Sequence, residues 1–108
     1  MTKTINISYC HCSLNELAAA DRQLVEAAFE ATRQAYAPFS GFRVGAAARL
    51  RSGEIITAAN CESEVFPSGL CAERSLLHYY ATNYATDPIE ALAIASDPSE
   101  RECYPCGA

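Results

Sequence analysis

The sequence predicts an α/β domain in which helices pack on a mixed β-sheet. The order of its segments carries this prediction, because a strand that follows a helix returns to the sheet on which that helix packs. Helical spacing of apolar residues alternates with short β-type runs, in the order helix 21–36, strand 42–50, strand 54–59, helix 71–83 and strand 90–96. Residues 1–108 are predicted to form a single domain. Because the chain ends soon after the third strand, we expect this domain to be incomplete at its C-terminal side.

The first helix has the clearest periodicity in the chain. Leu24, Ala28 and Phe29 recur at helical spacing, and Pro38 ends the element because an interior proline removes a backbone donor. Ahead of this helix, residues 1–12 contain a short run in which apolar and polar side chains alternate. This run predicts an additional short strand or an extended arm.

The middle of the chain is predicted to form a hairpin, a loop and a second helix. Ser52 and Gly53 are a turn signal between the two β-type runs. Residues 60–70 lack periodicity and contain Pro67 and Gly69, so they are expected to form a loop. The second helix is expected to place three apolar side chains on its inner face, namely Leu76, Leu77 and Tyr80.

Composition argues against several classes of protein. The chain has 8 Lys and Arg residues against 13 Asp and Glu residues, a formal net charge of −5, whereas binding a nucleic-acid polymer requires clustered cations. No apolar stretch approaches the roughly 20 residues of a membrane span, and the first residues lack the apolar core of a signal peptide. We therefore expect a cytoplasmic protein that binds neither nucleic-acid polymers nor membranes. In that compartment, the six cysteines favour metal binding or catalysis over disulfides.

The segment Cys71-Ala72-Glu73-Arg74 carries the most chemical information. Cys71 stands at the start of a predicted helix, where unpaired backbone N–H groups and the helix dipole favour the thiolate form. Thiolate is the form that binds zinc, and Arg74 adds a fixed positive charge nearby. Glu73 can approach a metal-activated water and carry protons. Cys71 and Glu73 are therefore candidates for a metal ligand and a proton carrier.

A second segment, Pro105-Cys106, fits the later half of a known pattern. Zinc-dependent nucleobase deaminases carry His-x-Glu followed by Pro-Cys-x-x-Cys, and in one version three cysteines bind the metal. Here Cys71-x-Glu73 and Pro105-Cys106 fit that pattern, and the third cysteine would fall at position 109, just beyond Ala108. We expect the complete gene to continue with a cysteine at that position.

Other segments resemble the homotetrameric zinc-dependent cytidine deaminase family. Tyr36–Ala47 resembles the segment that opens the hairpin of that family, Asn60-Cys61-Glu62 resembles its ribose-binding element, and Pro67–Arg74 resembles its zinc helix. Several motifs in one order are much more specific than any one of them alone. The resemblance extends from about residue 20 to residue 108. It implies a three-layer α-β-α fold, one Zn²⁺ per subunit and a homotetramer with its active sites near subunit borders.

On the metal side, the resemblance implies roles for four residues. Cys71 and Cys106 would be zinc ligands, and Glu73 would be the catalytic proton shuttle. Arg74 would donate hydrogen bonds to the ligand sulfurs, and its charge would offset that of the thiolates. The implied reaction is the hydrolytic deamination of cytidine or deoxycytidine, which yields uridine or deoxyuridine and ammonia.

On the nucleoside side, the resemblance implies a further set of contacts. Asn60 and Glu62 would hold the ribose hydroxyls, and Phe42 would pack against the pyrimidine ring. The backbone N–H of Ala72 would face the carbonyl of the base. The substrate implied is a small-molecule nucleoside, and the residues do not distinguish cytidine from deoxycytidine.

Alternative functions stay open at the level of sequence. A catalytically inactive zinc- or nucleoside-binding domain of the same fold is one, because the third cysteine is not part of the chain. A deaminase of another nucleoside analogue is a second, although Asn60 and Glu62 favour a ribose. Cys103-x-x-Cys106 is a complete Cys-x-x-Cys pair that could bind a metal together with Cys71. An enzyme that edits polynucleotides is disfavoured by the net charge of −5.

Overall fold

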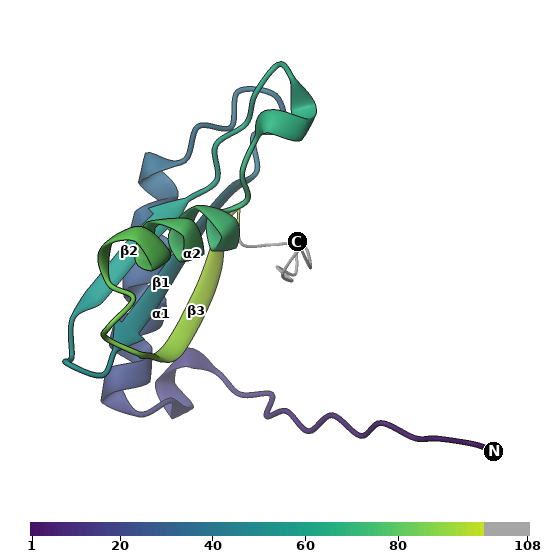
Figure 1. Ribbon diagram of the computed structural model, residues 1–108. Helices are drawn as coiled ribbons and strands as arrows, with labels where there is room; N and C mark the ends of the chain where they lie inside the picture. Colours follow the sequence, from purple (N-terminus) through teal and green to yellow (C-terminus); the bar gives the residue numbers. More distant parts are fainter. Residues whose placement is uncertain (99–108) are drawn as a thin grey trace.

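The computed structural model describes residues 1–98, which form a three-stranded sheet with one helix on each face (Figure 1). The helices are α1 (Ala19–Ala31) and α2 (Ala72–Asn83), and the strands are β1 (Arg43–Leu50), β2 (Ile55–Ala59) and β3 (Ile89–Asp97). Short 3₁₀ segments lie at Leu14–Glu16, Thr32–Gln34 and Phe66–Ser68. The predicted α/β class and the layering of helix, sheet and helix are confirmed.

Strand β1 is the centre of the sheet, whose order is β2-β1-β3. It pairs antiparallel with both neighbours, so that Ala47 lies opposite Thr57 on one side and Ala93 on the other. Among residues 1–98, the one parallel pairing is an isolated bridge between Tyr36 and Cys61. Because β1 is enclosed on both edges and both faces, it forms the rigid base from which the functional loops extend.

Alternate residues of β1 face opposite helices. Ala46, Ala48 and Leu50 are buried together with Leu76 of α2, while Ala47 is buried with side chains of α1, namely Leu24 and Ala28. A strand that is covered on both faces does not alternate polar with apolar residues, and residues 44–48 of β1 are all apolar or glycine. The small alanine side chains let both helices approach the sheet closely.

The predicted hairpin is confirmed, and its turn depends on a glycine. Gly53 has a φ angle of 97°, which L-residues with a side chain rarely adopt. Its N–H donates to the carbonyl of Leu50 at 2.9 Å, and the N–H of Leu50 donates to the carbonyl of Glu54 at 2.9 Å. Ser52 ties the turn to the segment before β3, because its N–H and its hydroxyl donate to Asp87 at 3.1 and 2.5 Å.

Both predicted helices are present, with corrected details. Helix α1 begins at Ala19 rather than at residue 21 and gives way at Thr32 to a 3₁₀ turn. The prediction that Leu77 lies on the inner face of α2 is wrong, because its side chain is 41% exposed. Successive residues are about 100° apart around a helix, so a helix that buries Leu76 and packs Tyr80 against the same core leaves Leu77 outside.

The N-terminal residues form an arm and not a strand. They extend away from the sheet (Figure 1), and their side chains Ile5, Ile7 and Tyr9 are 88%, 83% and 89% exposed. Of the two alternatives predicted for residues 1–12, the arm is therefore the one observed. In the part of the chain that the structure describes, no helix is long and apolar enough to cross a membrane.

Candidate functional site

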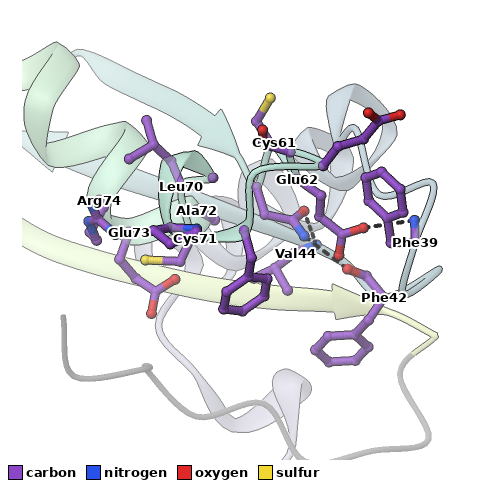
Figure 2. A pocket seen from close by; sticks show the side chains of 16 residues that line it. Phe39, Phe42, Val44, Cys61, Glu62, Leu70, Cys71, Ala72, Glu73 and Arg74 are labelled. Carbon is purple, nitrogen blue, oxygen red and sulfur yellow. Dashed lines mark hydrogen bonds between the residues drawn. The ribbon is translucent and has the colours of Figure 1, made fainter.

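A cleft with a volume of about 630 Å³ collects the predicted site residues. Its walls come from the segment that leads into β1, the loop that follows β2 and the first turn of α2 (Figure 2). Residues far apart in the sequence meet here, and they include Phe42, Asn60, Glu62, Cys71, Ala72, Glu73 and Arg74. Cys106, the remaining predicted ligand, and Cys103 lie outside the described residues.

The metal side of the cleft is the N-terminus of α2. Cys71 directly precedes the helix, and the completely buried Ala72 begins it. The first backbone N–H groups of a helix have no acceptor within the helix, so the Cys71 sulfur lies at the positive end of the α2 dipole. Cys71 and Glu73 are both half-buried, and Figure 2 shows the sulfur and the carboxyl group directed toward the same side of the cleft.

The backbone of Cys61 links the loop after β2 to the segment just before α2. Its N–H and carbonyl exchange hydrogen bonds of 2.9 Å with the carbonyl and N–H of Leu70, the residue before Cys71. On the other side, Tyr36 donates to the carbonyl of Asn60 at 3.0 Å and accepts from the N–H of Glu62 at 2.8 Å. The Asn60–Glu62 segment is therefore held between two neighbours. The thiol of Cys61 points away from the Glu62 carboxyl group, as the alternation of an extended segment requires (Figure 2).

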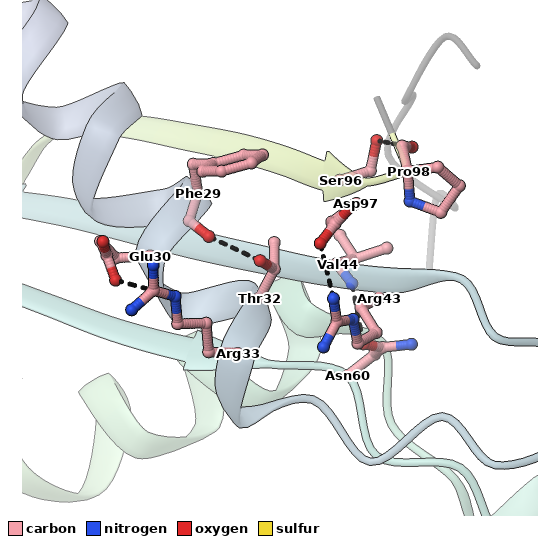
Figure 3. A network of polar contacts seen from close by, with 10 residues as sticks. All are labelled: Phe29, Glu30, Thr32, Arg33, Arg43, Val44, Asn60, Ser96, Asp97 and Pro98. Atoms are coloured by element: carbon pink, nitrogen blue, oxygen red, sulfur yellow. Dashed lines mark hydrogen bonds and ion pairs between the residues drawn. The ribbon is translucent and has the colours of Figure 1, made fainter. Parts of the chain in front are cut away.

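Asn60 holds the start of β1 with its side-chain amide. Oδ1 accepts the N–H of Val44 at 2.9 Å, and Nδ2 donates to the carbonyl of Phe42 at 3.0 Å. Figure 3 shows Asn60 beside β1, where Arg43 also pairs with Asp97 of β3 at 2.6 Å. An amide has two donor hydrogens and two acceptor lone pairs. Each end of the Asn60 side chain therefore keeps one hydrogen-bonding position for a ligand.

The Glu62 carboxylate binds the residues just before those that Asn60 holds. Its Oε1 atom accepts the N–H groups of Phe39 at 2.9 Å and Ser40 at 3.1 Å, and its Oε2 atom accepts the Ser40 hydroxyl. The hydroxyl and the N–H of Ser40, followed by the N–H of Phe39, lower the pKa of Glu62 below its ordinary value. The side chain is thus held as a carboxylate, which accepts hydrogen bonds and cannot donate them.

Ser40 is a partner of Glu62 that the sequence did not single out. It stands inside the Tyr36–Ala47 segment that carries the family resemblance, but nothing in its neighbourhood along the chain indicates a role. Only the fold brings it to Glu62, which is 22 residues later. A serine followed by glycine and an aromatic residue is also an ordinary turn sequence, so no sequence signal distinguished it.

The donors in the cleft suit Zn²⁺. Cys71 offers a soft sulfur ligand at a helix N-terminus, and the carboxyl group of Glu73 lies close by to handle protons. Within residues 1–98, no three His, Cys, Asp or Glu side chains gather into a metal site. A tetrahedral protein site therefore needs ligands from outside those residues, where Cys106 is the predicted one.

Comparisons with known proteins agree with this chemistry. Residues 18–108 match the family described as the cytidine and deoxycytidylate deaminase zinc-binding region. The chain is 38% identical over 89 residues to the cytidine deaminase of Halalkalibacterium halodurans, which covers 82% of this chain and 66% of that protein. It is 33% identical over 84 residues to a probable cytidine deaminase of Dictyostelium discoideum, which covers 78% of this chain and 56% of that protein.

Solved structures show the same similarity in three dimensions. The cytidine deaminase of Burkholderia pseudomallei superposes with a TM-score of 0.70 at 35% identity, over 79% of this chain and 67% of that one. The cytidine deaminase of Mycobacterium tuberculosis gives a TM-score of 0.69 at 32% identity. The chain spans 66% of the length of the Halalkalibacterium halodurans relative and 56% of the Dictyostelium discoideum relative.

Proposed function

The chain belongs to the family of the cytidine and deoxycytidylate deaminase zinc-binding region, and from this we propose that it carries the hydrolytic deamination of cytidine or deoxycytidine. One observation carries the proposal: a single cleft joins the Asn60–Glu62 segment to the Cys71–Arg74 turn. The first offers hydrogen-bonding groups for a ribose, and the second offers a metal ligand and a proton carrier. A nucleoside substrate accounts for both segments, because its ribose would contact the first and its base the second.

Glu73 is the residue that would move protons in this reaction. Its carboxylate takes a proton from the attacking water and delivers it to N3 of the cytosine ring while the oxygen bonds to C4. It then carries the proton of the new C4 hydroxyl to the exocyclic amino group, and the C4–N bond breaks as the C4 carbonyl forms and ammonia leaves. Cys71 and Cys106 would hold Zn²⁺, which would supply Lewis-acid activation of the attacking water. Arg74, next to Glu73 on α2, offsets the negative charge of the ligand sulfurs.

The nucleoside would lie between the two segments. Asn60 and Glu62 would bind the ribose hydroxyls with the hydrogen-bonding positions that their contacts to the protein leave open. Phe42 would pack against the pyrimidine ring. The backbone N–H of Ala72 would face the base carbonyl, which agrees with its place in the first turn of α2, where N–H groups lack helical acceptors.

We further propose a homotetramer that acts in cytoplasmic pyrimidine salvage. Support for assembly comes from the loop beside the cleft, where Val65 and Phe66 are 64% and 89% exposed. Large apolar side chains that cluster at a surface are typical of protein interfaces. Sedimentation of the zinc-loaded chain measures the oligomeric state, and a monomer would contradict this part of the proposal.

The experiment compares wild type with Glu73→Gln after loading with zinc. Cytidine is added, and turnover is followed by ammonia release and by the loss of cytidine absorbance. Glu73→Gln keeps the size of the side chain but cannot carry the proton, so turnover should fall by about 10²–10⁴-fold while bound zinc stays unchanged. Glu64→Gln, at another acidic residue that lines the cleft, is the matched control and should retain turnover.

Two results would contradict the proposal. If zinc-loaded wild type binds zinc but releases no ammonia from cytidine or deoxycytidine, the enzymatic function is wrong, and uridine binding without turnover would favour an inactive nucleoside-binding domain. If Glu73→Gln turns over as fast as wild type, the assignment of the proton carrier is wrong.

A further inference from the structure

The hydroxyl of Ser40 lies between two residues assigned to the nucleoside. It donates a hydrogen bond to Oε2 of Glu62 and accepts one from the backbone N–H of Phe42 at 3.0 Å. We propose that Ser40 is a positioning residue, which holds the Glu62 carboxylate and the Phe42 backbone together and thereby sets the affinity of the cleft for ribose. This inference rests on the proposed function of the cleft.

The backbone of Phe42 is held on both sides by the Asn60–Glu62 segment. Its N–H donates to Ser40, which in turn donates to Glu62, and its carbonyl accepts from Asn60 at 3.0 Å. Because Gly41 precedes it with a φ angle of 68°, Phe42 follows a position with wide conformational freedom. The contact from Asn60 does not involve Ser40, so the residue whose ring faces the base keeps its anchor on the carbonyl side without the Ser40 hydroxyl. Removing the Ser40 hydroxyl leaves the carbonyl contact and deletes the one on the N–H side.

The same hydroxyl decides which part of the Glu62 carboxylate is left for a ligand. Oε1 already accepts two backbone N–H groups, from Phe39 and Ser40, which fills its two lone pairs. Oε2 accepts the Ser40 hydroxyl with one of its lone pairs, which leaves the other for a hydroxyl donor. A carboxylate that can no longer rotate presents that lone pair in one direction, which reduces the entropy lost when a ribose binds.

The charge of Glu62 strengthens the arrangement, because hydrogen bonds to a carboxylate are stronger than those between neutral groups. The segment that faces Glu62 contributes its backbone and the neutral hydroxyl of Ser40, and the next charged side chain on it, Arg43, is paired with Asp97. The other ionisable side chains that line the cleft are Cys61, Glu64, Cys71, Glu73 and Arg74. The pKa of Glu62 is lowered chiefly by the Ser40 hydroxyl, so loss of that hydroxyl should raise it.

The chain contains a matched control for this serine. At the β1–β2 turn, Ser52 donates its N–H and hydroxyl to the carboxylate of Asp87 and accepts an N–H from the residue two positions later, Glu54, at 3.4 Å. This is the same pattern as Ser40 with Glu62 and Phe42, but it lies at the opposite end of β1. Ser52→Ala therefore removes an equivalent set of bonds without touching the cleft.

The test measures the binding of uridine and of the free base uracil to the zinc-loaded chain by calorimetry. Ser40→Ala should weaken uridine binding by about tenfold, the effect of one charge-assisted hydrogen bond, and should leave uracil binding nearly unchanged. Ser40→Thr keeps a hydroxyl and should restore uridine affinity, while Ser52→Ala should bind both ligands as wild type does. Carbon NMR of the Glu62 carboxyl group should show its pKa raised in Ser40→Ala alone. Circular dichroism checks that each variant is folded.

The outcomes separate this inference from the function on which it rests. If wild type does not bind uridine, the proposed function is wrong, and the inference falls with it. If wild type binds uridine and Ser40→Ala binds it equally well, the positioning role alone is wrong. Equal losses of uridine and uracil affinity in Ser40→Ala would also overturn it, because the effect would then not concern the ribose.

Discussion

At Gly45 the backbone of α1 lies directly against β1, and replacing this residue with alanine should destabilise the fold strongly. A Cβ atom placed on Gly45 would lie 2.0 Å from the carbonyl oxygen of Ala28 and 2.9 Å from the backbone nitrogen of Thr32. Both atoms belong to backbone, so neither can move as a side-chain end would. Since an ordinary contact between carbon and oxygen is about 3.3 Å or longer, α1 would have to withdraw from β1 by roughly 1.3 Å.

That displacement sets the size of the effect. The buried contacts of Leu24 and Ala28 with Ala47 lie along the same interface, and a gap of about 1 Å forfeits a large part of their dispersion energy. Strain from overpacking usually costs about 1–3 kcal/mol, whereas the added methyl group contributes at most about 0.8 kcal/mol in burial. We expect Gly45→Ala to lower the free energy of unfolding by about 3 kcal/mol.

Urea denaturation followed by circular dichroism measures this loss of free energy. An unchanged m-value would show that the substitution changes stability and not the surface exposed on unfolding. Gly41→Ala is the control, because a Cβ there meets nothing within 4 Å. The Gly41→Ala variant should lose only the free energy that a side chain costs at a positive φ angle, about 1–2 kcal/mol. If Gly45→Ala is no less stable than Gly41→Ala, the steric argument is refuted.

Two further predictions concern the core and the response to pH. Leu76→Ala should lower the free energy of unfolding by about 2–5 kcal/mol in the same assay, because Leu76 is fully buried between α2 and the sheet; a smaller loss would mean that the core collapses around the cavity. Glu62→Gln should flatten the acid side of the stability profile. Hydrogen bonds from Ser40 and Phe39 lower the pKa of folded Glu62, so its stabilising effect is present above the ordinary pKa of a glutamate and is lost as the pH falls through the lowered one. Identical acid profiles for Glu62→Gln and wild type would contradict that sign.

The order of elements could be predicted from the sequence because each has a local signal. The apolar spacing of α1, the Ser52-Gly53 turn and the loop before Cys71 are all visible within a few residues of chain, and each appears where it was expected. Boundaries were less accurate, because tertiary contacts decide where α1 changes into a 3₁₀ turn. The exposure of Leu77 was missed for a different reason. The apolar character of a residue next to the buried face of a helix does not show whether it packs on the sheet or faces solvent.

The site could be predicted only as far as its chemistry is local. Cys71 and Glu73 lie two residues apart at a helix start, so a joint role could be proposed from the sequence, and the structure places both in the cleft. The contacts of Asn60 and Glu62 with residues 39–44 depend on the hairpin and on the bridge at Cys61, which no local pattern encodes. The family resemblance suggested roles for these two residues toward a ligand. It did not indicate their roles toward the protein.

Those second roles change how substitutions at the nucleoside side have to be interpreted. Asn60 holds the backbone at Phe42 and Val44, so removing its amide would disturb the ring proposed to pack on the base as well as any ribose contact. Glu62 likewise holds Phe39 and Ser40. A loss of nucleoside affinity in either variant therefore combines two causes, and the comparison of uridine with uracil separates them. Direct loss of a ribose contact lowers only the affinity for uridine, whereas a displaced Phe42 lowers the affinity for both.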